Sequence, residues 1–256
     1  GCVCCGFGDD LLETLQSLRD APQPFDHVVI ETSGVALPRN LRATVSLAPG
    51  ITVAATLVLA DAESVRRLAG DRYVGDTVRD QLRSADLLLL TKCDLLDHDA
   101  LDAVADWLHA QADAPMLRVT GGEVPVEVLL GEFDRPPRTG TLAARSDGSL
   151  RPQAHGTARY DTEAFVVDAA LDPHRLASAL ADLSPPLVRA KGLVRAPDGR
   201  LHAVQLVGRR STVAPAPAGA SGTGRLVAIA AGQRLDREAV RAAIAAAEQA
   251  SENEAR

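Results

Sequence analysis

Aromatic residues are scarce in this sequence, and long apolar runs are absent. Phe, Trp and Tyr make up 3% of the 256 residues, so we expect a core packed with aliphatic side chains. No apolar run approaches the roughly 20 residues that a membrane-spanning helix needs. The first residues also lack a basic segment followed by an apolar signal-peptide core. We therefore expect a cytoplasmic protein that does not act at a membrane.

Positive charge is also in deficit, with 27 Lys and Arg against 34 Asp and Glu and a formal net charge of −7. A protein that neutralises nucleic-acid phosphates needs clustered Lys and Arg, so we expect no nucleic-acid partner. The hydrophobic content is 46%. A chain of this length and composition buries one large core or two modest ones, and we expect two domains.

The first part of the chain, residues 1–133, alternates between helix-like segments and short apolar runs. That alternation is typical of a parallel α/β sheet with helices on both faces. Asp10 and Glu13 predict a capping box for a helix whose apolar stripe is Leu11, Leu15 and Leu18. A second helix is predicted over 97–112 with Asp97 as its cap. The predicted strands cover residues 28–30, 52–59, 87–90 and 116–120.

The second part differs in composition and pattern. Residues 134–158 are dominated by Pro, Gly, Ser, Arg and Thr, which predicts a flexible linker. Residues 159–250 predict a smaller α+β domain. Its expected strands cover residues 160–168, 192–207 as a hairpin, and 226–230, and its expected helices cover 173–183 and 236–250. The low-complexity insert 213–224 is predicted to be a flexible loop.

Three of the four cysteines, Cys2, Cys4 and Cys5, lie within four positions. Buried structural cysteines have no reason to crowd together, whereas thiolates are soft ligands for zinc or cuprous ions. Three thiolates leave one position of a tetrahedral ion open, which suits a transferable metal better than a structural zinc site. A redox pair is the alternative for the same residues.

The segment Glu31-Thr32-Ser33-Gly34 directly follows the predicted strand 28–30. In P-loop proteins an acidic residue at such a strand end helps to hold Mg²⁺ or its waters, and a following glycine lets the backbone approach the γ-phosphate. Taken alone the signal is weak, because Glu at a strand end is commonly a solvated turn residue. Its position relative to other motifs decides its weight.

The segment Thr91-Lys92-Cys93-Asp94 follows the predicted strand 87–90 in the same way. The Asp94 carboxylate can accept hydrogen bonds from the N1 and N2 protons of guanine, which adenine does not present, and Lys92 can lay its aliphatic stem along the base. The alternative is that Asp94 caps the next helix. The spacing from Glu31-Gly34 favours a nucleotide.

The order GCxCC, ETSG, a strand ending in Asp61-Ala62, and TKCD resembles the CobW family of P-loop GTPases. In the second part, Arg189-Ala190-Lys191-Gly192 resembles the RxKG segment of the CobW carboxyl-terminal domain. The resemblance implies metal ligation by Cys2, Cys4 and Cys5. It implies Mg²⁺-side and switch roles for Glu31, Thr32 and Gly34, and guanine recognition by Thr91, Lys92 and Asp94. It gives no role to Arg189 or Lys191.

The resemblance implies a GTP-dependent metallochaperone or metal-insertion GTPase that uses GTP and Mg²⁺. Its cargo would be Zn²⁺, with cobalt as the alternative, and its partner a client metalloprotein; a homo-oligomer is also compatible with the family. Two other hypotheses stay open on the residues alone. One is a thiol redox protein that uses two of the clustered cysteines, and the other is a non-enzymatic metal-binding module.

Two features depart from the family pattern. No Gly-rich GxxxxGK[ST] loop occurs in the 256 residues, although the family places it before the cysteines. Because that loop supplies most of the phosphate binding, we expect the chain alone to be catalytically inactive. Thr91 also stands where the family usually has Asn. A hydroxyl cannot act as an amide, so we expect a somewhat weaker preference for guanine.

Overall fold

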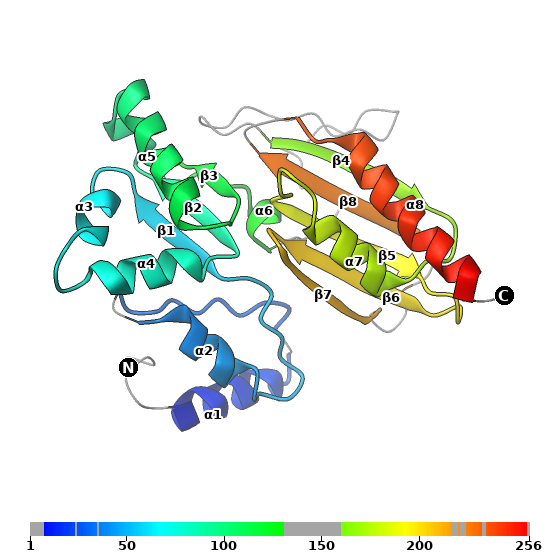
Figure 1. The fold of residues 1–256 in the computed structure, drawn as a ribbon. Coiled ribbons are helices and arrows are strands. Elements are labelled where there is room, and N and C mark those ends of the chain that lie inside the picture. Colours follow the sequence, from blue (N-terminus) through cyan, green and yellow to red (C-terminus); the bar gives the residue numbers. More distant parts are fainter. Residues whose placement is uncertain are drawn as a thin grey trace.

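The computed structural model describes residues 8–23, 25–34, 36–130, 160–216, 220, 224–231 and 234–254. Two sheets organise these residues: a three-stranded sheet followed by a five-stranded sheet (Figure 1). The predicted linker 134–158 lies outside the described residues, so the domain boundary stays a prediction. Among the described residues, no helix is both long enough and apolar enough to cross a membrane.

The first sheet is parallel in the order β1-β2-β3, as the sequence predicted. Residues 52–56, predicted to open the first of these strands, are not part of it. The strands are β1 (Leu57–Asp61), β2 (Leu87–Thr91) and β3 (Met116–Arg118). The helices of this part are α1 (Gly8–Arg19), α2 (Pro38–Val45), α3 (Val65–Ala69), α4 (Gly75–Arg83), α5 (His98–Gln111) and α6 (Val126–Leu130), with the short 3₁₀ helix η1 (Cys93–Leu95).

The four leucines of β2 are buried on both faces of the sheet. Leu88 and Leu90 pack in one cluster with residues of α4 and α5. Leu87 and Leu89 point to the opposite face, where their cluster includes α6 and residues of the second sheet. A parallel strand covered on both sides reads as a continuous apolar run, which is why the sequence identified β2 correctly.

The predicted buried strand 28–30 is absent, and this prediction was wrong. Val28 and Val29 are 43% and 81% exposed and belong to an irregular segment. A strand requires a hydrogen-bonded neighbour. Among the described residues, β1 pairs only with β2, so residues 28–30 do not pair with its second edge.

Helices α1 and α2 form a small cluster of their own. Leu11 and Leu15 of the predicted stripe are buried in it with Val45 and Ala48. The helix begins at Gly8, so Asp10 lies inside it and the predicted capping box is wrong. Ion pairs join α2 to α4 and to the residue before β2: Arg39 to Asp80 at 3.4 Å, and Arg42 to Asp86 at 3.5 Å.

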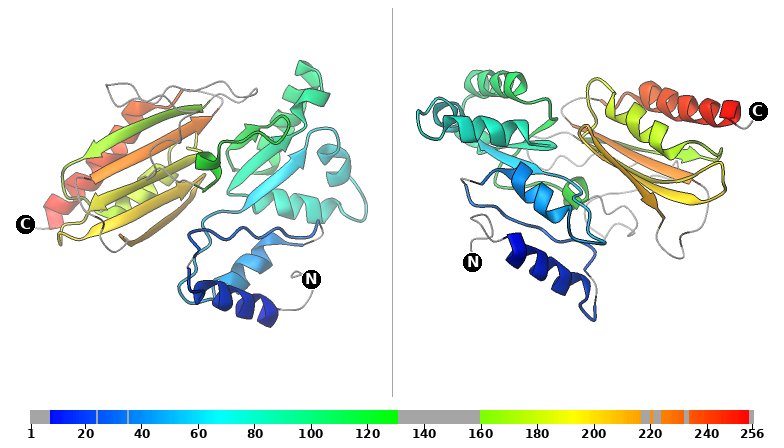
Figure 2. Two further views of the ribbon diagram at one scale, coloured as in Figure 1. Left: turned by 180° about the vertical axis from the view of Figure 1, so that it is seen from behind. Right: turned by 60° about the horizontal axis from the view of Figure 1, so that its bottom comes forward.

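The second sheet is antiparallel in the order β4-β8-β5-β6-β7. Helices α7 and α8 pack on one of its faces (Figures 1 and 2). The predicted α+β domain is therefore confirmed as a fold. Its elements are β4 (Tyr160–Val167), α7 (Pro173–Ala181), β5 (Arg189–Arg195), β6 (Leu201–Val207), β7 (Arg210–Pro215), β8 (Gly224–Ala231) and α8 (Arg237–Glu254).

Strand β7 was not predicted, because the sequence analysis assigned residues from 213 onward to a flexible loop. Its pairing with β6 begins at Val207 and Arg210, so Gly208 and Arg209 form a two-residue hairpin turn. Gly208 has a φ of +57°, a conformation that glycine adopts without steric cost. The alanines and prolines around residue 215 look like a low-complexity loop, so the glycine turn before them was not interpreted as part of a hairpin.

That hairpin turn touches the first sheet. A Cβ added to Gly208 would lie 2.2 Å from the carbonyl oxygen of Asp86, just before β2. Arg209 forms a 2.8 Å ion pair with Asp113, and the Arg210 Nε donates to the carbonyl of Val53 at 3.2 Å. The amino-terminal ends of the parallel strands therefore lie against the second sheet, and their carboxyl ends carry the candidate site.

Arg189 of the RAKG segment has a clear structural partner. Its side chain is almost fully buried, and it donates to the carbonyl oxygens of Leu129 at 2.7 Å and Leu130 at 2.8 Å. These are the last carbonyls of α6, which a helix leaves without internal partners. Burial lowers the Arg189 pKa to about 10, so the guanidinium is still charged at neutral pH. Arg189 thus fastens α6 to the second sheet.

Candidate nucleotide-binding edge

The carboxyl ends of β1 and β2 lie side by side, because Asp61 pairs in register with Thr91. Ligands of α/β sheets bind at such ends. The Lys92 Nζ lies 2.7 Å from Oδ2 of Asp61. The hydrogen bond from Lys92 holds the pKa of Asp61 below its ordinary value, and the same bond raises the pKa of Lys92. Both groups are therefore charged at neutral pH.

Lys92 has a left-handed backbone, with φ of 58° and ψ of 35°. It is the one non-glycine residue with positive φ in the described part of the chain. Such a conformation costs on the order of 1–2 kcal/mol for a residue with a Cβ. It turns the chain sharply after β2, and the ion pair with Asp61 fixes where the Lys92 side chain points.

Asp94 lies in η1, directly after this turn, and is exposed. Its carboxylate accepts no hydrogen bond from any residue that the structure describes. The cap of the following helix is Asp97, whose side chain accepts from the Ala100 N–H at 2.8 Å. Asp94 is therefore not the helix cap that the sequence left as its alternative role. Its acceptors are available to a ligand.

Thr91 is engaged inside the protein. Its hydroxyl donates to the carbonyl oxygen of Ala60 on β1 at 3.3 Å, and the residue is half-buried. A hydroxyl has one proton to donate. While this bond holds, Thr91 cannot donate to a base, so base recognition at this edge would depend on Asp94 and Lys92.

Glu31, Thr32 and Gly34 lie in the irregular segment before α2. Glu31 and Gly34 are exposed, and Thr32 is half-buried. Gln81 of α4 holds this segment by donating to the carbonyls of Gly34 and Ala36, both at 2.9 Å. No bond between described residues joins Glu31, Thr32 or Gly34 to Lys92 or Asp94. The sequence analysis did not identify Gln81, which has no motif around it.

A second loop lies against η1, and the sequence analysis missed it. The Cys93 N–H donates to the carbonyl of Val119 at 3.5 Å, and the Val119 N–H donates to the carbonyl of Leu90 at 2.8 Å. Gly121 and Gly122 follow with φ of +61° and +78°, and a Cβ on either would meet no atom within 4 Å. Two adjacent glycines after a predicted strand were the available signal.

The three clustered cysteines, Cys2, Cys4 and Cys5, lie outside the described residues. Within the described ranges, no group of three or more His, Cys, Asp or Glu side chains is placed to hold a metal ion. The remaining cysteine, Cys93, is buried, its thiol donates to the Leu90 carbonyl at 3.0 Å, and burial raises its pKa. Cys93 is therefore a packing residue.

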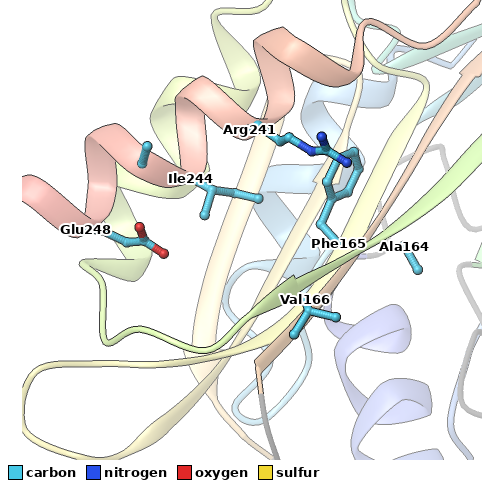
Figure 3. A pocket seen from close by; sticks show the side chains of 7 residues that line it. Ala164, Phe165, Val166, Arg241, Ile244 and Glu248 are labelled. Atoms are coloured by element: carbon cyan, nitrogen blue, oxygen red, sulfur yellow. The ribbon is translucent and has the colours of Figure 1, made fainter.

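A hollow between β4 and α8 lies away from this edge (Figure 3). Its volume is about 400 Å³. The Arg241 guanidinium lies 5.9 Å from the centre of the Phe165 ring at one side of it. Since none of the predicted site residues line this hollow, it does not bear on their roles.

Comparison with protein families agrees with the order of the motifs. The nucleotide-binding domain model described as CobW/HypB/UreG matches residues 1–118. The model of the cobalamin synthesis protein CobW carboxyl-terminal domain matches residues 160–248. The two matches correspond to the parallel and the antiparallel sheet, and together they include every predicted site residue.

Several curated proteins are similar to part of the chain. The zinc chaperone CobW of a Sinorhizobium species is 33% identical over 155 residues, covering 51% of this chain and 44% of that protein. The zinc chaperone CobW of Pseudomonas aeruginosa is 31% identical over 155 residues, covering 51% and 41%. The zinc-regulated GTPase metalloprotein activator 1 of Dictyostelium discoideum is 26% identical over 162 residues, covering 52% and 34%. The chain spans less than half the length of these relatives.

Among solved structures, the Zn(II)-bound YjiA GTPase from E. coli is 22% identical to the chain. That likeness covers 95% of this chain and 77% of the other, with a TM-score of 0.42. The assignment itself depends on the two family models, on the curated relatives and on the ordered motifs. On this combined basis, the chain belongs to the CobW family of P-loop GTPases.

Proposed function

We propose that this chain is part of a GTP-dependent metallochaperone or metal-insertion GTPase whose cargo is zinc. The assignment of GTP as the nucleotide is supported mainly by the position and hydrogen bonding of Asp94. Its exposed carboxylate accepts no hydrogen bond from the described residues, although it lies at the ligand-binding edge beside the Lys92–Asp61 pair.

Guanine fits this arrangement by its hydrogen-bonding groups. At neutral pH the carboxylate of Asp94 offers only acceptors, and guanine presents two adjacent donors at N1 and N2. Adenine presents an acceptor at N1, so it would place acceptor against acceptor. Lys92 lies two residues before Asp94, and its side chain is 54% exposed, so its aliphatic stem can contact a base.

Mg²⁺ would be held on the side of Glu31 and Thr32. The exposed carboxylate of Glu31 and the hydroxyl of Thr32 are oxygen ligands, which Mg²⁺ prefers. When bound, the ion neutralises charge that develops on the transferred phosphoryl group. Gln81 tethers the carbonyls of Gly34 and Ala36. This tether gives the Glu31–Gly34 segment a fixed attachment to α4, from which it could respond to the nucleotide.

Zinc enters the proposal as transferred cargo. The names of the curated relatives describe zinc chaperones and a zinc-regulated GTPase. Cys2, Cys4 and Cys5 supply three soft ligands and leave one tetrahedral position for a client's ligand. A client metalloprotein would complete the coordination as it takes the ion. Cobalt is the alternative cargo.

The nucleotide half is tested by base preference in a protein that joins this chain to a phosphate-binding loop. GTP should bind at least about tenfold more tightly than ATP, because a mismatched carboxylate costs about 1–3 kcal/mol. Asp94→Asn should weaken GTP and favour xanthosine triphosphate, whose extra carbonyl accepts from the new amide. The matched control is Asp97→Asn, which alters the α5 cap. If Asp94→Asn leaves GTP affinity unaltered, Asp94 does not read the base.

The cargo half is tested by zinc competition on the chain with Cys2, Cys4 and Cys5 all changed to Ser. We expect loss of the tightest zinc site, because hydroxyls are poor zinc ligands. Cys93→Ser is the matched control and should leave zinc affinity unchanged, since that thiol is buried. Unchanged stoichiometry and affinity in the triple variant would refute the zinc site and favour a redox role for the thiols.

A further inference from the structure

The two helices of the second domain, α7 and α8, leave the other face of the five-stranded sheet uncovered (Figure 2). The cluster under α7 and α8 takes alternate residues of the strands, including Phe165, Ala190, Val194, Leu226 and Ala228. Residues between them point to the opposite side, because successive side chains of a strand alternate between faces. We call that opposite side the outer face.

The strand register defines the members of the outer face. They are Tyr160, Thr162, Ala164 and Val166 on β4; Arg225, Val227, Ile229 and Ala231 on β8; Arg189, Lys191, Leu193 and Arg195 on β5; Leu201, Ala203, Gln205 and Val207 on β6; and Arg210, Thr212 and Ala214 on β7. These positions include five cations and not one Asp or Glu.

Part of the outer face is occupied by the first sheet. Ile229 and Val207 share a cluster with Leu87, Leu89 and Leu117 of β2 and β3. Arg189 and Arg210, in the same rows of the register, donate to carbonyls of the first domain. The interface therefore uses two of the five cations. Arg195 donates to the Gly199 carbonyl at 2.9 Å, and Lys191 and Arg225 lie on the remaining outer face.

Lys191 and Arg225 are diagonal neighbours on adjacent strands. Leu193 lies opposite Arg225 and Val227 lies opposite Lys191, so the two cations are separated by one step along the strand and one across. Diagonal positions of this kind are within reach of long side chains. Within the described ranges, neither residue has a carboxylate as an ion-pair partner. Two like charges thus lie close together, and no described carboxylate compensates them.

The acidic residues of β4 point to the other side. Asp161 and Glu163 alternate with the outer-face positions, and Glu163 contacts Arg237 and Arg241 of α8. Figure 3 shows the same alternation at the next residues of β4. Phe165 lies under Arg241, and Val166 points away from α8. Val166 is 70% exposed. The outer face thus combines the exposed Arg225 and the half-buried Lys191 with apolar side chains such as Val166 and Leu193.

We propose that the outer face is a docking surface for an acidic segment of another protein. Carboxylates of that segment would meet Lys191 and Arg225, and its apolar side chains would meet Leu193, Ala203 and Val166. The proposal goes beyond the GTPase assignment and does not depend on it. It also gives Lys191 of the RAKG segment a function that neither its sequence nor its motif supplies.

Other occupants fit the charge less well. A second copy of this chain would bring the same cations to a two-fold interface, where they would repel. Nucleic acid is disfavoured, because the chain carries a net charge of −7 and the outer-face positions include one aromatic residue, Tyr160, at the domain interface. The sequence between the two sheets is itself basic, with arginines at positions 135, 138, 145, 151 and 159.

The test is fluorescence anisotropy of the whole chain with a labelled peptide of alternating Glu and Leu, at low ionic strength. We expect saturable binding that weakens with added salt. The double variant Lys191→Glu with Arg225→Glu should weaken it about tenfold or more, because opposing charges become like charges. The matched control is Arg66→Glu with Arg67→Glu, two exposed positions on α3 that change the net charge equally. Circular dichroism checks that both variants fold.

Three results would overturn the proposal. The first is no binding of the peptide to the parent chain. The second is equal weakening by the two double variants, which would mean that net charge alone attracts the peptide. The third is a single-stranded oligonucleotide that displaces the peptide and binds more tightly in a manner dependent on Lys191 and Arg225, which would make nucleic acid the occupant.

Discussion

Lys92 and Asp61 form the only bond between side chains that the structure describes across the ends of β1 and β2. Both side chains are partly exposed, at 54% and 29%. An ion pair this accessible contributes little to stability. Its main effect is on geometry, because it sets the direction of Lys92 in a left-handed backbone that precedes Asp94.

The Lys92–Asp61 pair should make the free energy of unfolding depend on pH. The pKa of Asp61 is lowered in the folded state, so its ionised form contributes stability above the ordinary Asp pKa of 3.8 and loses it as pH falls. Lys92→Met should therefore lower the free energy of unfolding slightly at neutral pH. The difference from the parent should vanish as pH falls through the folded-state pKa of Asp61. Urea titrations at several pH values measure it.

The double variant Lys92→Met with Asp61→Asn is the control for that experiment. At low pH its free energy of unfolding should match that of Lys92→Met. Across the acid range it should show none of the pH dependence that the ion pair causes. A difference between parent and Lys92→Met that stays constant across the acid range would mean that the Lys92 stem, and not its charge, stabilises this edge.

At the scale of elements, α6 depends on a residue from the other sheet. A helix of five residues has little stability of its own. The Arg189 guanidinium supplies donors to two of its last carbonyls and favours the negative end of the helix. The cost is a buried cation with a pKa lowered to about 10. Helix α6 is therefore attached to the second sheet as well as to the first.

Arg189→Met should therefore release α6. The change leaves the Leu129 and Leu130 carbonyls without their donors, which costs about 1–3 kcal/mol per group that remains buried. We expect faster hydrogen exchange at the α6 amides, for example at Val128 and Leu129. Arg189→Lys keeps the charge and should restore part of the protection. Unchanged exchange in Arg189→Met would show that apolar packing alone holds α6.

Elements with strong local patterns could be predicted from the sequence. The buried leucines of β2 and the Asp97 cap of α5 are examples, and the structure confirms both. Residues 28–30 were mistaken for a strand because their β-branched composition favours one. Composition does not show whether a neighbouring strand is available for hydrogen bonding. The hairpin at Gly208 was missed because its turn is recognised only once the pairing of β6 with β7 is known.

The candidate site was predictable in its residue types and less so in its bonds. Strand ends followed by TKCD indicated Lys92 and Asp94. The engagement of Thr91 with Ala60, the pair of Lys92 with Asp61 and the tether from Gln81 are contacts between distant parts of the chain. Periodicity and motif spacing do not specify such contacts. The roles of the cysteines and of Glu31 stay predictions.

Across the whole molecule, the two sheets are joined on one side of the parallel strands and at their amino-terminal ends. A shared cluster includes Leu87 and Leu89 of β2 with Val207 and Ile229 of the second sheet. The opposite ends of the parallel strands carry the candidate residues for nucleotide binding. Strand β2 thus runs from the domain interface at one end to the TKCD loop at the other, which gives the two regions a direct physical connection.

Gly208 lies in this interface without room for a Cβ, and it supplies a test of how far the two sheets depend on one another. Gly208→Ala would place a Cβ 2.2 Å from the Asp86 carbonyl and 2.9 Å from Cδ of Pro115, so the hairpin must move away from the first sheet. Gly199→Ala is the matched control, because it also has positive φ but meets no atom within 4 Å. Both changes incur the left-handed backbone cost of about 1–2 kcal/mol.

The single Trp, Trp107 on α5, reports unfolding of the first domain by fluorescence. If the interface stabilises that domain, Gly208→Ala should lower the urea midpoint of the Trp107 transition, whereas Gly199→Ala should leave it close to the parent value. Equal midpoints in the two variants would mean that the parallel sheet is stable without its contact to the second domain.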